Sequence, residues 1–429
     1  MKSTKKVYYV GVLMALLSSS VYAQPTWTLD KVVSLTRHGV RPQTDTAKLD
    51  KATGLKWPKF LVPDGHLTGH GYTGMWQQGR YQLHQWQNEG LRIKQAQKCP
   101  NPQNYFLWSS PSQRIKASAK AMSDGMFAGC GIIPASVNAK YGPLFELYHL
   151  HQAHPNHKVM KQQIMARMGS PEQAQKRYKD SVELLRRTVC APHSCKFLDK
   201  PWGVHFKSTG KPALNGPGKY GATIGETIRL QYSDNLPIKD VAFGHGNNAK
   251  AVKALMAIHA AQYNLALDTP EFAAHSGSLL MRQILSALSA KTSYAAKYPG
   301  DKRLARPLVM FFGHDTNIAE IQTMIGFNWT LKGYPKNDIP PGGTLSFARF
   351  HNNHTGQEFV RVRFAARSLD QWRTLSRLNA NHPLLHQDLS FKGCQNTALG
   401  SLCPLGPTLK RASRLLVKDG LNLAVFKTH

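Results

Sequence analysis

The chain is poor in acidic side chains and in long apolar runs. It carries 24 Asp and Glu against 55 Lys and Arg, which gives a formal net charge of +31 with neutral histidines. Beyond residue 23, no apolar run reaches the length of about 18 residues that a membrane-spanning helix needs. Internal repeats and low-complexity runs are also absent. These absences exclude a membrane span in the mature chain and a repeat architecture.

The excess of positive charge raises the local concentration of polyanions without specifying which one binds. The sequence has no helix-turn-helix pattern, no RNA-binding signature and no repeating basic-aromatic array, so we predict no nucleic-acid partner. Two explanations of the charge stay open: it steers an anionic substrate, or it aids solubility and attachment to an acidic envelope.

The N-terminus has the pattern of a secretory signal peptide. Three lysines precede an apolar stretch from Val7 to Leu17, and Val21-Tyr22-Ala23 follows it. This order predicts a signal peptide over residues 1–23, cleaved before Gln24, and a mature protein that is periplasmic or secreted. An uncleaved N-terminal anchor is the alternative.

The six cysteines favour disulfides over a metal site, because an even count in an exported protein is typical of a disulfide framework. The sequence alone leaves several pairings open. The 19 histidines are scattered without metal-ligand spacing. We therefore predict no metal and no organic cofactor.

Two motifs follow predicted buried strands. Arg37-His38-Gly39-Val40-Arg41 comes after Leu29–Leu35, and Gly313-His314-Asp315 comes after Leu308–Phe312. In open α/β sheets, ligands bind beyond the carboxyl ends of the strands. The apolar spacing over Thr316–Ile325 predicts a helix capped by Asp315 or Thr316, with its amide groups toward an anion.

These residue types suit the transfer of a phosphoryl group. A phosphate monoester repels anionic nucleophiles, so a neutral His38 between two arginines is a fitting attacking group. The Arg37 and Arg41 guanidinium groups match pairs of phosphate oxygens. Asp315 would protonate the leaving oxygen and His314 would donate to the transferring oxygens. Because His38 must be neutral and Asp315 protonated, we expect an acidic optimum.

Further segments extend the pattern well beyond the two motifs. They are Gly65-His66-Leu67-Thr68, Asn328-Trp329-Thr330-Leu331, Pro340-Pro341-Gly342-Gly343 and Gly393 to Cys403. With them, nearly the whole mature chain resembles the histidine acid phosphatases, in particular the bacterial periplasmic phytases, acid phosphatases and glucose-1-phosphatases. The resemblance implies that His38 is the nucleophile and Asp315 the proton donor. It also implies phosphate binding by Arg37, Arg41, Thr44, Arg114 and His314.

Some of these assignments keep an alternative. Pro42 directly follows Arg41, whereas the family commonly places its proline one position later, so Thr44 is either a phosphate ligand or a loop hydroxyl bonded to its own backbone. Arg114 is either the third phosphate arginine or a solvated arginine on a helix face. Glu226 lies where related phytases have a glutamate near the catalytic centre, and the alternative is a helix-surface glutamate.

The disulfide pairing follows from short separations and from the resemblance. Short separations favour Cys190 with Cys195 and Cys394 with Cys403. The family resemblance implies these two bridges and a third one between Cys99 and Cys130.

We predict an α/β fold with a mixed, mostly parallel sheet flanked by helices, of the phosphoglycerate mutase type, and an inserted, mainly helical lobe. Residues 24–145 and 300–429 form the predicted catalytic domain, and residues 146–299 form the helical domain on the other wall of the cleft. Leu198–Gly218, which is rich in Gly, Pro and Lys, is predicted to loop over the surface.

The predicted function is that of an exported phosphomonoesterase with a phosphohistidine intermediate, and the leading prediction is a phytase (acting on myo-inositol hexakisphosphate) with broader acid phosphatase activity. A glucose-1-phosphatase or a general sugar-phosphate phosphatase is the alternative, which Gln231-Tyr232 favours by resemblance. A phosphoglycerate mutase-like isomerase and a non-catalytic polyanion-binding protein are alternatives of other classes. The expected partner is a small phosphorylated substrate, and we expect a monomer.

Overall fold

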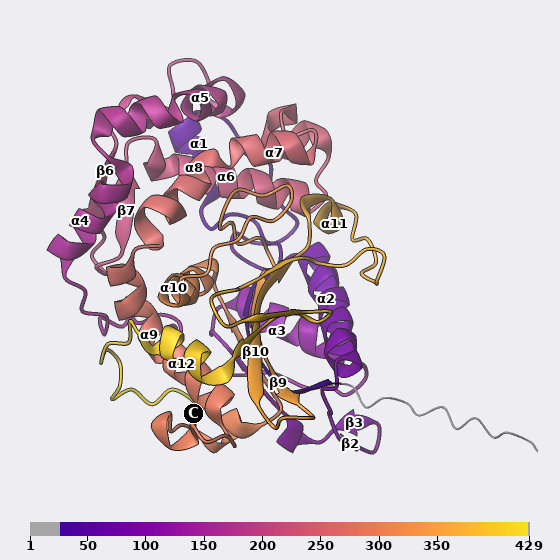
Figure 1. Ribbon diagram of the computed structural model, residues 1–429. Helices are drawn as coiled ribbons and strands as arrows, with labels where there is room; N and C mark the ends of the chain where they lie inside the picture. The colour runs from indigo at the N-terminus through magenta and orange to yellow at the C-terminus, as the bar shows by residue number, and fades with distance from the viewer. Residues whose placement is uncertain (1–25, 428–429) are drawn as a thin grey trace, which may run out of the picture.

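The computed structural model describes residues 26–427, so the predicted signal peptide lies outside the described residues. Within them, no helix combines the length and the apolar character needed to cross a bilayer. The fold is the predicted α/β class, a mixed sheet flanked by helices (Figure 1).

The centre of the molecule is a nine-stranded sheet in the order β12-β13-β10-β9-β1-β8-β4-β5, with β11 paired to β10. Its parallel half joins β1, β8, β4 and β5. Its antiparallel half begins where β9 pairs with β1. The strands of the parallel half are Trp27–Arg37 (β1), Tyr105–Ser109 (β4), Ala135–Ser136 (β5) and Leu308–Gly313 (β8). The antiparallel strands are Thr344–Asn352 (β9), Glu358–Ala366 (β10), Leu385–Asp388 (β11), Gln395–Thr397 (β12) and Gly400–Pro404 (β13).

Strand β8 shows why its sequence is apolar throughout. Leu308, Met310 and Phe312 belong to one buried cluster, whereas Val309 and Phe311 belong to the other. Successive side chains of a strand point to opposite faces, so a strand covered on both sides has no polar position.

Helices cover both faces of the sheet (Figure 1). One face carries α2 and α3, and the other carries α9, α10 and α12. These helices are Gly69–Asn88 (α2), Gln113–Met126 (α3), Pro270–Ser289 (α9), Asp315–Ile325 (α10) and Leu405–Ser413 (α12). The short helix Leu369–Arg373 (α11) and the small ladder of Gln95–Ala96 (β2) with Cys99–Pro100 (β3) lie at the periphery.

The segment between β5 and α9 is mainly helical and gathers at one end of the molecule (Figure 1). Its helices are His157–Met168 (α4), Pro171–Val189 (α5), Gly218–Ser233 (α6), Ala249–Leu255 (α7) and Ala257–Gln262 (α8), the last continuing into a π-helical turn, Tyr263–Leu267. The early helix Thr46–Thr53 (α1) also lies there, because its Thr53 carbonyl accepts from the Ala191 amide at 2.9 Å.

The prediction that Leu198–Gly218 loops over the surface misses two short strands. Gly203–Phe206 (β6) and Pro212–Asn215 (β7) pair as an antiparallel hairpin there, and Gly210 takes the positive φ of +85° that its turn requires. Glycine and proline marked the turn and concealed the two short strands around it.

Three disulfides link the cysteine pairs that the sequence analysis named. They join Cys99 to Cys130, Cys190 to Cys195 and Cys394 to Cys403. The second bridge lies directly after α5, and the third ties the loop before β12 to β13.

Candidate active site

Three neighbouring parallel strands deliver the candidate residues to one edge of the sheet. Arg37 on β1 is in register with Gly313 on β8, and Ser109 on β4 is in register with Phe312 on β8. The chain leaves β1 into His38 and Arg41, leaves β8 into His314 and Asp315, and leaves β4 into α3, which carries Arg114. Because carboxyl ends of parallel strands share one edge, distant segments of the chain meet there.

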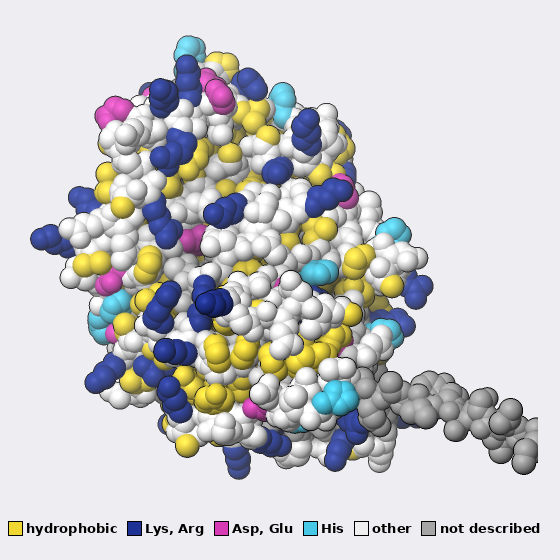
Figure 2. Space-filling view, viewed as in Figure 1, with side chains coloured by type: hydrophobic (Ala, Val, Ile, Leu, Met, Phe, Trp, Pro, Cys, Tyr) yellow, Lys and Arg dark blue, Asp and Glu magenta, His cyan; other side chains and the backbone are white. Residues whose placement is uncertain are grey.

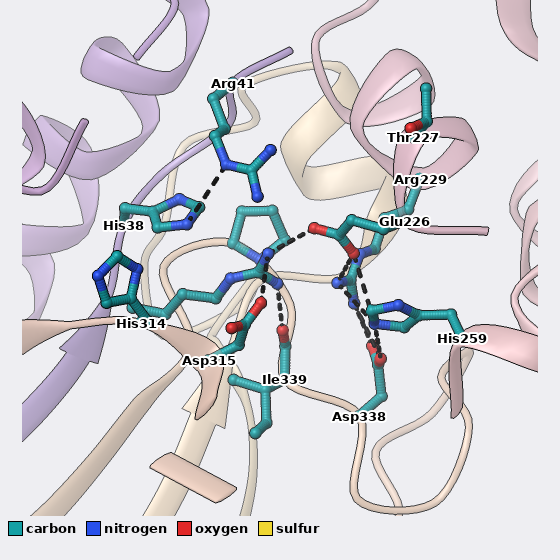
Figure 3. Close-up of polar contacts among 12 residues, drawn as sticks. His38, Arg41, Glu226, Thr227, Arg229, His259, His314, Asp315, Asp338 and Ile339 are labelled. Atoms are coloured by element: carbon teal, nitrogen blue, oxygen red, sulfur yellow. Dashed lines mark hydrogen bonds and ion pairs between the residues drawn. The ribbon is translucent and has the colours of Figure 1, made fainter. Parts of the chain in front are cut away.

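His38 is buried, with 2% of its surface exposed. Its Nδ1 lies 2.8 Å from the carbonyl oxygen of Gly39, so Nδ1 carries the proton and donates, and Nε2 keeps its lone pair. The Nε of Arg41 lies 3.5 Å from that Nε2 (Figure 3). Burial first, and then the charges of Arg41, Arg37 and Arg114, hold the pKa of His38 well below its usual range. His38 is therefore the neutral imidazole that the sequence analysis requires.

Backbone contacts fix the loop that carries His38. The amide of Gly342 donates to the carbonyl of His38 at 3.0 Å, and the amide of Arg37 donates to the carbonyl of Gly343 at 2.9 Å. Gly342 has φ +67°, a conformation that favours glycine. A Cβ on Gly39 would lie 2.8 Å from Met75 of α2, so this loop also approaches α2 too closely for a side chain.

Arg37 is fully buried and is held by a chain of charges that crosses to α6 (Figure 3). Its Nη2 is hydrogen-bonded to Glu226, and it lies 3.0 Å from Asp315 Oδ2. Glu226 also pairs with Arg229, whose Nη1 donates to Asp338 at 2.7 Å. Glu226 is only 8% exposed, so it is not a helix-surface residue. Although burial opposes ionisation, Arg229 and Arg37 lower the pKa of Glu226 and keep it an anion.

The buried network has a histidine at its far end. His259 Nε2 lies 3.3 Å from Arg229 Nη2 and accepts from it, while Nδ1 donates to the Ala222 carbonyl at 3.1 Å. Burial is the main cause that lowers the pKa of His259, so its ring is the neutral member of the network. Arg229, Asp338 and His259 escaped the sequence analysis because no local motif marks them.

Asp315 stands at the first turn of α10 and faces Arg37. His314 is the N-cap residue of this helix, so the prediction that Asp315 or Thr316 caps it is off by one residue. Asp315 Oδ1 accepts from the Thr316 amide at 2.8 Å. Burial opposes ionisation, but Arg37, His38, His314 and Arg41 together hold the pKa of Asp315 well below its usual range. Asp315 is therefore an anion in the free protein, whereas the protonated form predicted from the sequence is the one required in the first half-reaction.

His314 lies between Arg114 and a carboxylate that sequence reasoning missed. Arg114 Nη2 donates to His314 Nδ1 at 3.3 Å, and His314 Nε2 donates to Glu146 Oε1 at 3.3 Å. Glu146 is itself fixed by Ser110 Oγ at 2.5 Å and by the Gly142 amide at 2.6 Å. The His314 and His38 rings lie 6.2 Å apart and nearly perpendicular. Glu146 therefore sets the orientation and tautomer of His314.

Two connected hollows open beside these residues. The inner one, of about 250 Å³, is lined by His38, Arg41, Arg114, His314 and Asp315, among others, and we call it the phosphate hollow. The outer one, of about 640 Å³, which we call the outer cleft, is lined by Arg41, Thr44, Glu226 and Asp315 together with the β6–β7 hairpin. Thr44 is exposed and makes no hydrogen bond to another described residue, so it lies at the rim of the site.

The structure thus brings seven of the eight predicted residues into one cluster and places Thr44 at its edge. A neutral imidazole, two guanidinium groups, a second histidine and a carboxylate line one small hollow, and the carboxylate, that of Asp315, is paired with the buried guanidinium group of Arg37. This set defines a site for phosphoryl transfer through histidine.

The chain belongs to the histidine phosphatase superfamily, branch 2, whose family model matches residues 28–365. The crystal structure of a Klebsiella phytase superimposes with a TM-score of 0.86 at 30% identity, over 95% of this chain and 99% of that one. Glucose-1-phosphatase of Salmonella typhimurium is 26% identical over 94% of this chain and 97% of its own length. Phytase AppA of Escherichia coli is 25% identical over 92% of this chain and 94% of its own length. The protein is a phosphoric monoester hydrolase of this family.

Proposed function

We propose that the protein hydrolyses phosphate monoesters through a phosphohistidine at His38, with phytate as its main substrate. The observation that carries the proposal is the buried, neutral His38, whose Nε2 lone pair faces a hollow lined by Arg41, Arg114 and His314. A neutral nucleophile among fixed cations can approach a doubly charged ester.

In the first half-reaction, the lone pair of His38 Nε2 forms a bond to phosphorus as the bond to the leaving oxygen breaks. Asp315 gives its proton to that oxygen, so the leaving group departs as an alcohol. In the second half-reaction, water attacks the same phosphorus and passes a proton to the Asp315 carboxylate. The bond from phosphorus to nitrogen then breaks and returns the electron pair to His38, leaving inorganic phosphate. Arg37, Arg41 and Arg114 hold the three non-bridging oxygens.

Because Asp315 is an anion in the free protein, it must gain a proton when the substrate binds before it can act as the acid. A bound dianionic phosphate neutralises the arginines that depress the pKa of Asp315, and its negative charge favours the protonated carboxyl. Glu226 remains paired with Arg37 and Arg229, so the proton goes to Asp315 and not to Glu226. We propose that substrate binding itself raises the pKa of Asp315 and so allows its protonation.

The outer cleft supports a bulky, multiply charged substrate. It is larger than the phosphate hollow, and its lining includes lysines from α1, α6 and the β6–β7 hairpin: Lys48, Lys207, Lys211 and Lys219. We propose that residues 146–299 form the helical domain of this wall, and that the mature protein is exported. Two of the relatives above are named phytases, which agrees with this substrate, and one is a glucose-1-phosphatase.

The test is a panel of kcat/KM values for phytate, glucose-1-phosphate and 4-nitrophenyl phosphate. We expect phosphate release from all three, with the highest kcat/KM for phytate. A phytate value below that for glucose-1-phosphate would overturn the phytase assignment in favour of the sugar-phosphatase alternative. Failure to release phosphate from any of the three would overturn the hydrolase mechanism.

A further inference from the structure

Lys211 stands where the phosphate hollow meets the outer cleft. It lines both, together with Arg41, Asp315 and Thr316. Of these four, the mechanism uses Arg41 on the reacting phosphate and Asp315 on the leaving oxygen, while Lys211 has no role in it. The residue lies directly before β7, in the turn of the β6–β7 hairpin.

The ammonium group of Lys211 is connected to the catalytic acid through one hydroxyl. Its Nζ donates to Thr316 Oγ1 at 3.3 Å, and Thr316 Oγ1 lies 3.4 Å from Asp315 Oδ1. Asp315 marks the position of the leaving oxygen, because it must reach that atom to protonate it. Lys211 therefore lies on the leaving-group side of the site, two hydrogen bonds from Asp315.

The other lysines of the outer cleft differ from Lys211 in exposure. Lys48, Lys207 and Lys219 are exposed, whereas Lys211 is half-buried and its Nζ lies 6.0 Å from the centre of the Phe272 ring. Burial lowers the pKa of Lys211, while Glu320 and Asp315 oppose that effect. A charge withdrawn from water acts more strongly on an anion than one that the solvent screens.

We propose that Lys211 binds a second, non-reacting phosphate next to the scissile ester and so selects polyphosphorylated substrates over simple monoesters. This inference rests on the proposed function, since it concerns the leaving group of the same reaction. A lysine suits this position because it acts as a point charge with three rotatable donors, and the neighbouring phosphate changes its orientation as successive esters of one ring are cleaved. The reacting phosphate, whose geometry is fixed, is held by guanidinium forks.

The competing explanation is that Lys211 only positions Asp315 through Thr316. The two roles separate by substrate. A positioning residue acts on every ester that needs Asp315, whether or not it has a second phosphate. A residue that binds the neighbouring phosphate acts only on substrates that carry one.

The experiment compares the full mature chain with Lys211→Met, Lys211→Arg and the control Lys200→Met. Lys200 is exposed and lies just before the β6–β7 hairpin, outside both hollows, so its variant removes the same charge from the same region. The measurements are kcat and KM for phytate and for glucose-1-phosphate, whose leaving group is a sugar without a second phosphate.

For Lys211→Met we expect kcat/KM for phytate to fall by about 10- to 100-fold, mainly through KM, as for the loss of one charge-assisted contact. The value for glucose-1-phosphate should stay within about twofold, Lys211→Arg should recover most of the loss, and Lys200→Met should match the parent. Equal losses on both substrates would overturn the inference while leaving the phytase assignment intact. A parent enzyme that prefers glucose-1-phosphate would instead overturn the phytase assignment.

Discussion

The cations at the phosphate hollow and those in the outer cleft differ in burial and in ion pairing. Next to the hollow, Arg37 is fully buried and paired with two carboxylates, one of which is the lining residue Asp315. In the cleft, Lys48, Lys207 and Lys219 are exposed and form no ion pair within the described residues. A buried, paired cation keeps its geometry at the cost of desolvation, whereas an exposed one is adaptable and screened by salt. The rigid region is thus suited to the chemistry, and the exposed cations of the cleft are suited to attracting an anionic substrate.

The largest effect at the phosphate hollow is expected from removal of the nucleophile. His38→Ala should lower kcat by about four orders of magnitude or more on every substrate, because no covalent intermediate forms. The matched control is His84→Ala, at an exposed position on α2 away from both hollows, which should keep the parental rate. The measurement is steady-state phosphate release, with thermal unfolding to verify that both variants fold. A rate for His38→Ala within tenfold of the parent would remove the nucleophile assignment.

Replacing the acid tests the leaving-group side of the hollow. Asp315→Asn cannot protonate the departing oxygen, so kcat for phytate should fall by about 100- to 1,000-fold. In the first half-reaction the loss should be much smaller for 4-nitrophenyl phosphate, whose phenolate leaves without a proton. Single-turnover rates of leaving-group release from both esters measure the difference, free of the second half-reaction that the two esters share. If these rates fall by the same factor for both esters, Asp315 is not the proton donor.

The pair between Glu226 and Arg37 tests how much the buried network contributes. Glu226→Gln leaves two buried guanidinium groups without their shared partner, so we expect a loss of about 3 kcal/mol in the free energy of unfolding. We also expect kcat/KM to fall by about 10- to 100-fold, because Arg37 becomes misplaced. Denaturant unfolding and kinetics measure both. The control is Asp199→Asn, which breaks an exposed pair with Arg186. It should change neither the free energy of unfolding nor the activation free energy derived from kcat/KM by more than about 0.5 kcal/mol.

The pH profile tests the proposed protonation of Asp315 on substrate binding. Because Asp315 must be protonated in the complex, kcat should fall as pH rises from 5 to 8, approaching about tenfold per pH unit above the pKa that the bound ester sets. The depressed pKa of His38 means that kcat/KM should show no loss of activity as pH falls through 6.5. Initial rates in a constant-ionic-strength buffer series measure both limbs. A kcat that rises steadily with pH contradicts the scheme.

The smallest effect is expected in the exposed part of the outer cleft. Lys207→Met should lower kcat/KM for phytate by less than about threefold at low salt, and the difference should vanish at about 0.5 M salt. A large, salt-independent loss would show that the exposed cations hold the substrate directly and would blur the distinction between the two regions. Rates at two ionic strengths are sufficient.

The sequence predicted the first region far better than the second. Arg37 to Arg41 and His314-Asp315 are contiguous motifs that follow apolar strands, so local pattern and strand-end geometry together locate them. The predicted α/β class is confirmed, and the proposed roles of the site residues stay predictions. Glu146, Arg229 and Asp338 come from unrelated segments and meet only through tertiary packing. No spacing along the sequence predicts that these residues lie near the site.

The errors have physical causes. The β6–β7 hairpin was hidden because strands of four residues around a glycine turn leave too short a pattern to separate from a loop. The sequence predicts a proton on Asp315 during the reaction but carries no sign of its state in the free protein, where Arg37, His38, His314 and Arg41 lower its pKa. The resemblance named the residues but not the electrostatics between them.

The pairing of β1 with β8 has a consequence for how such a protein can change. The chain leaves β1 at Arg37 and enters the parallel strand β8 at Leu308, opposite Val32, so the pairing of the two strands fixes where the long excursion between them begins and ends. Segments within that excursion, such as the hairpin bearing Lys211, can be exchanged or lengthened without altering the spacing of the two strands. Grafting a hairpin from a relative with another substrate is therefore a direct route to a redirected enzyme built on unchanged reaction chemistry.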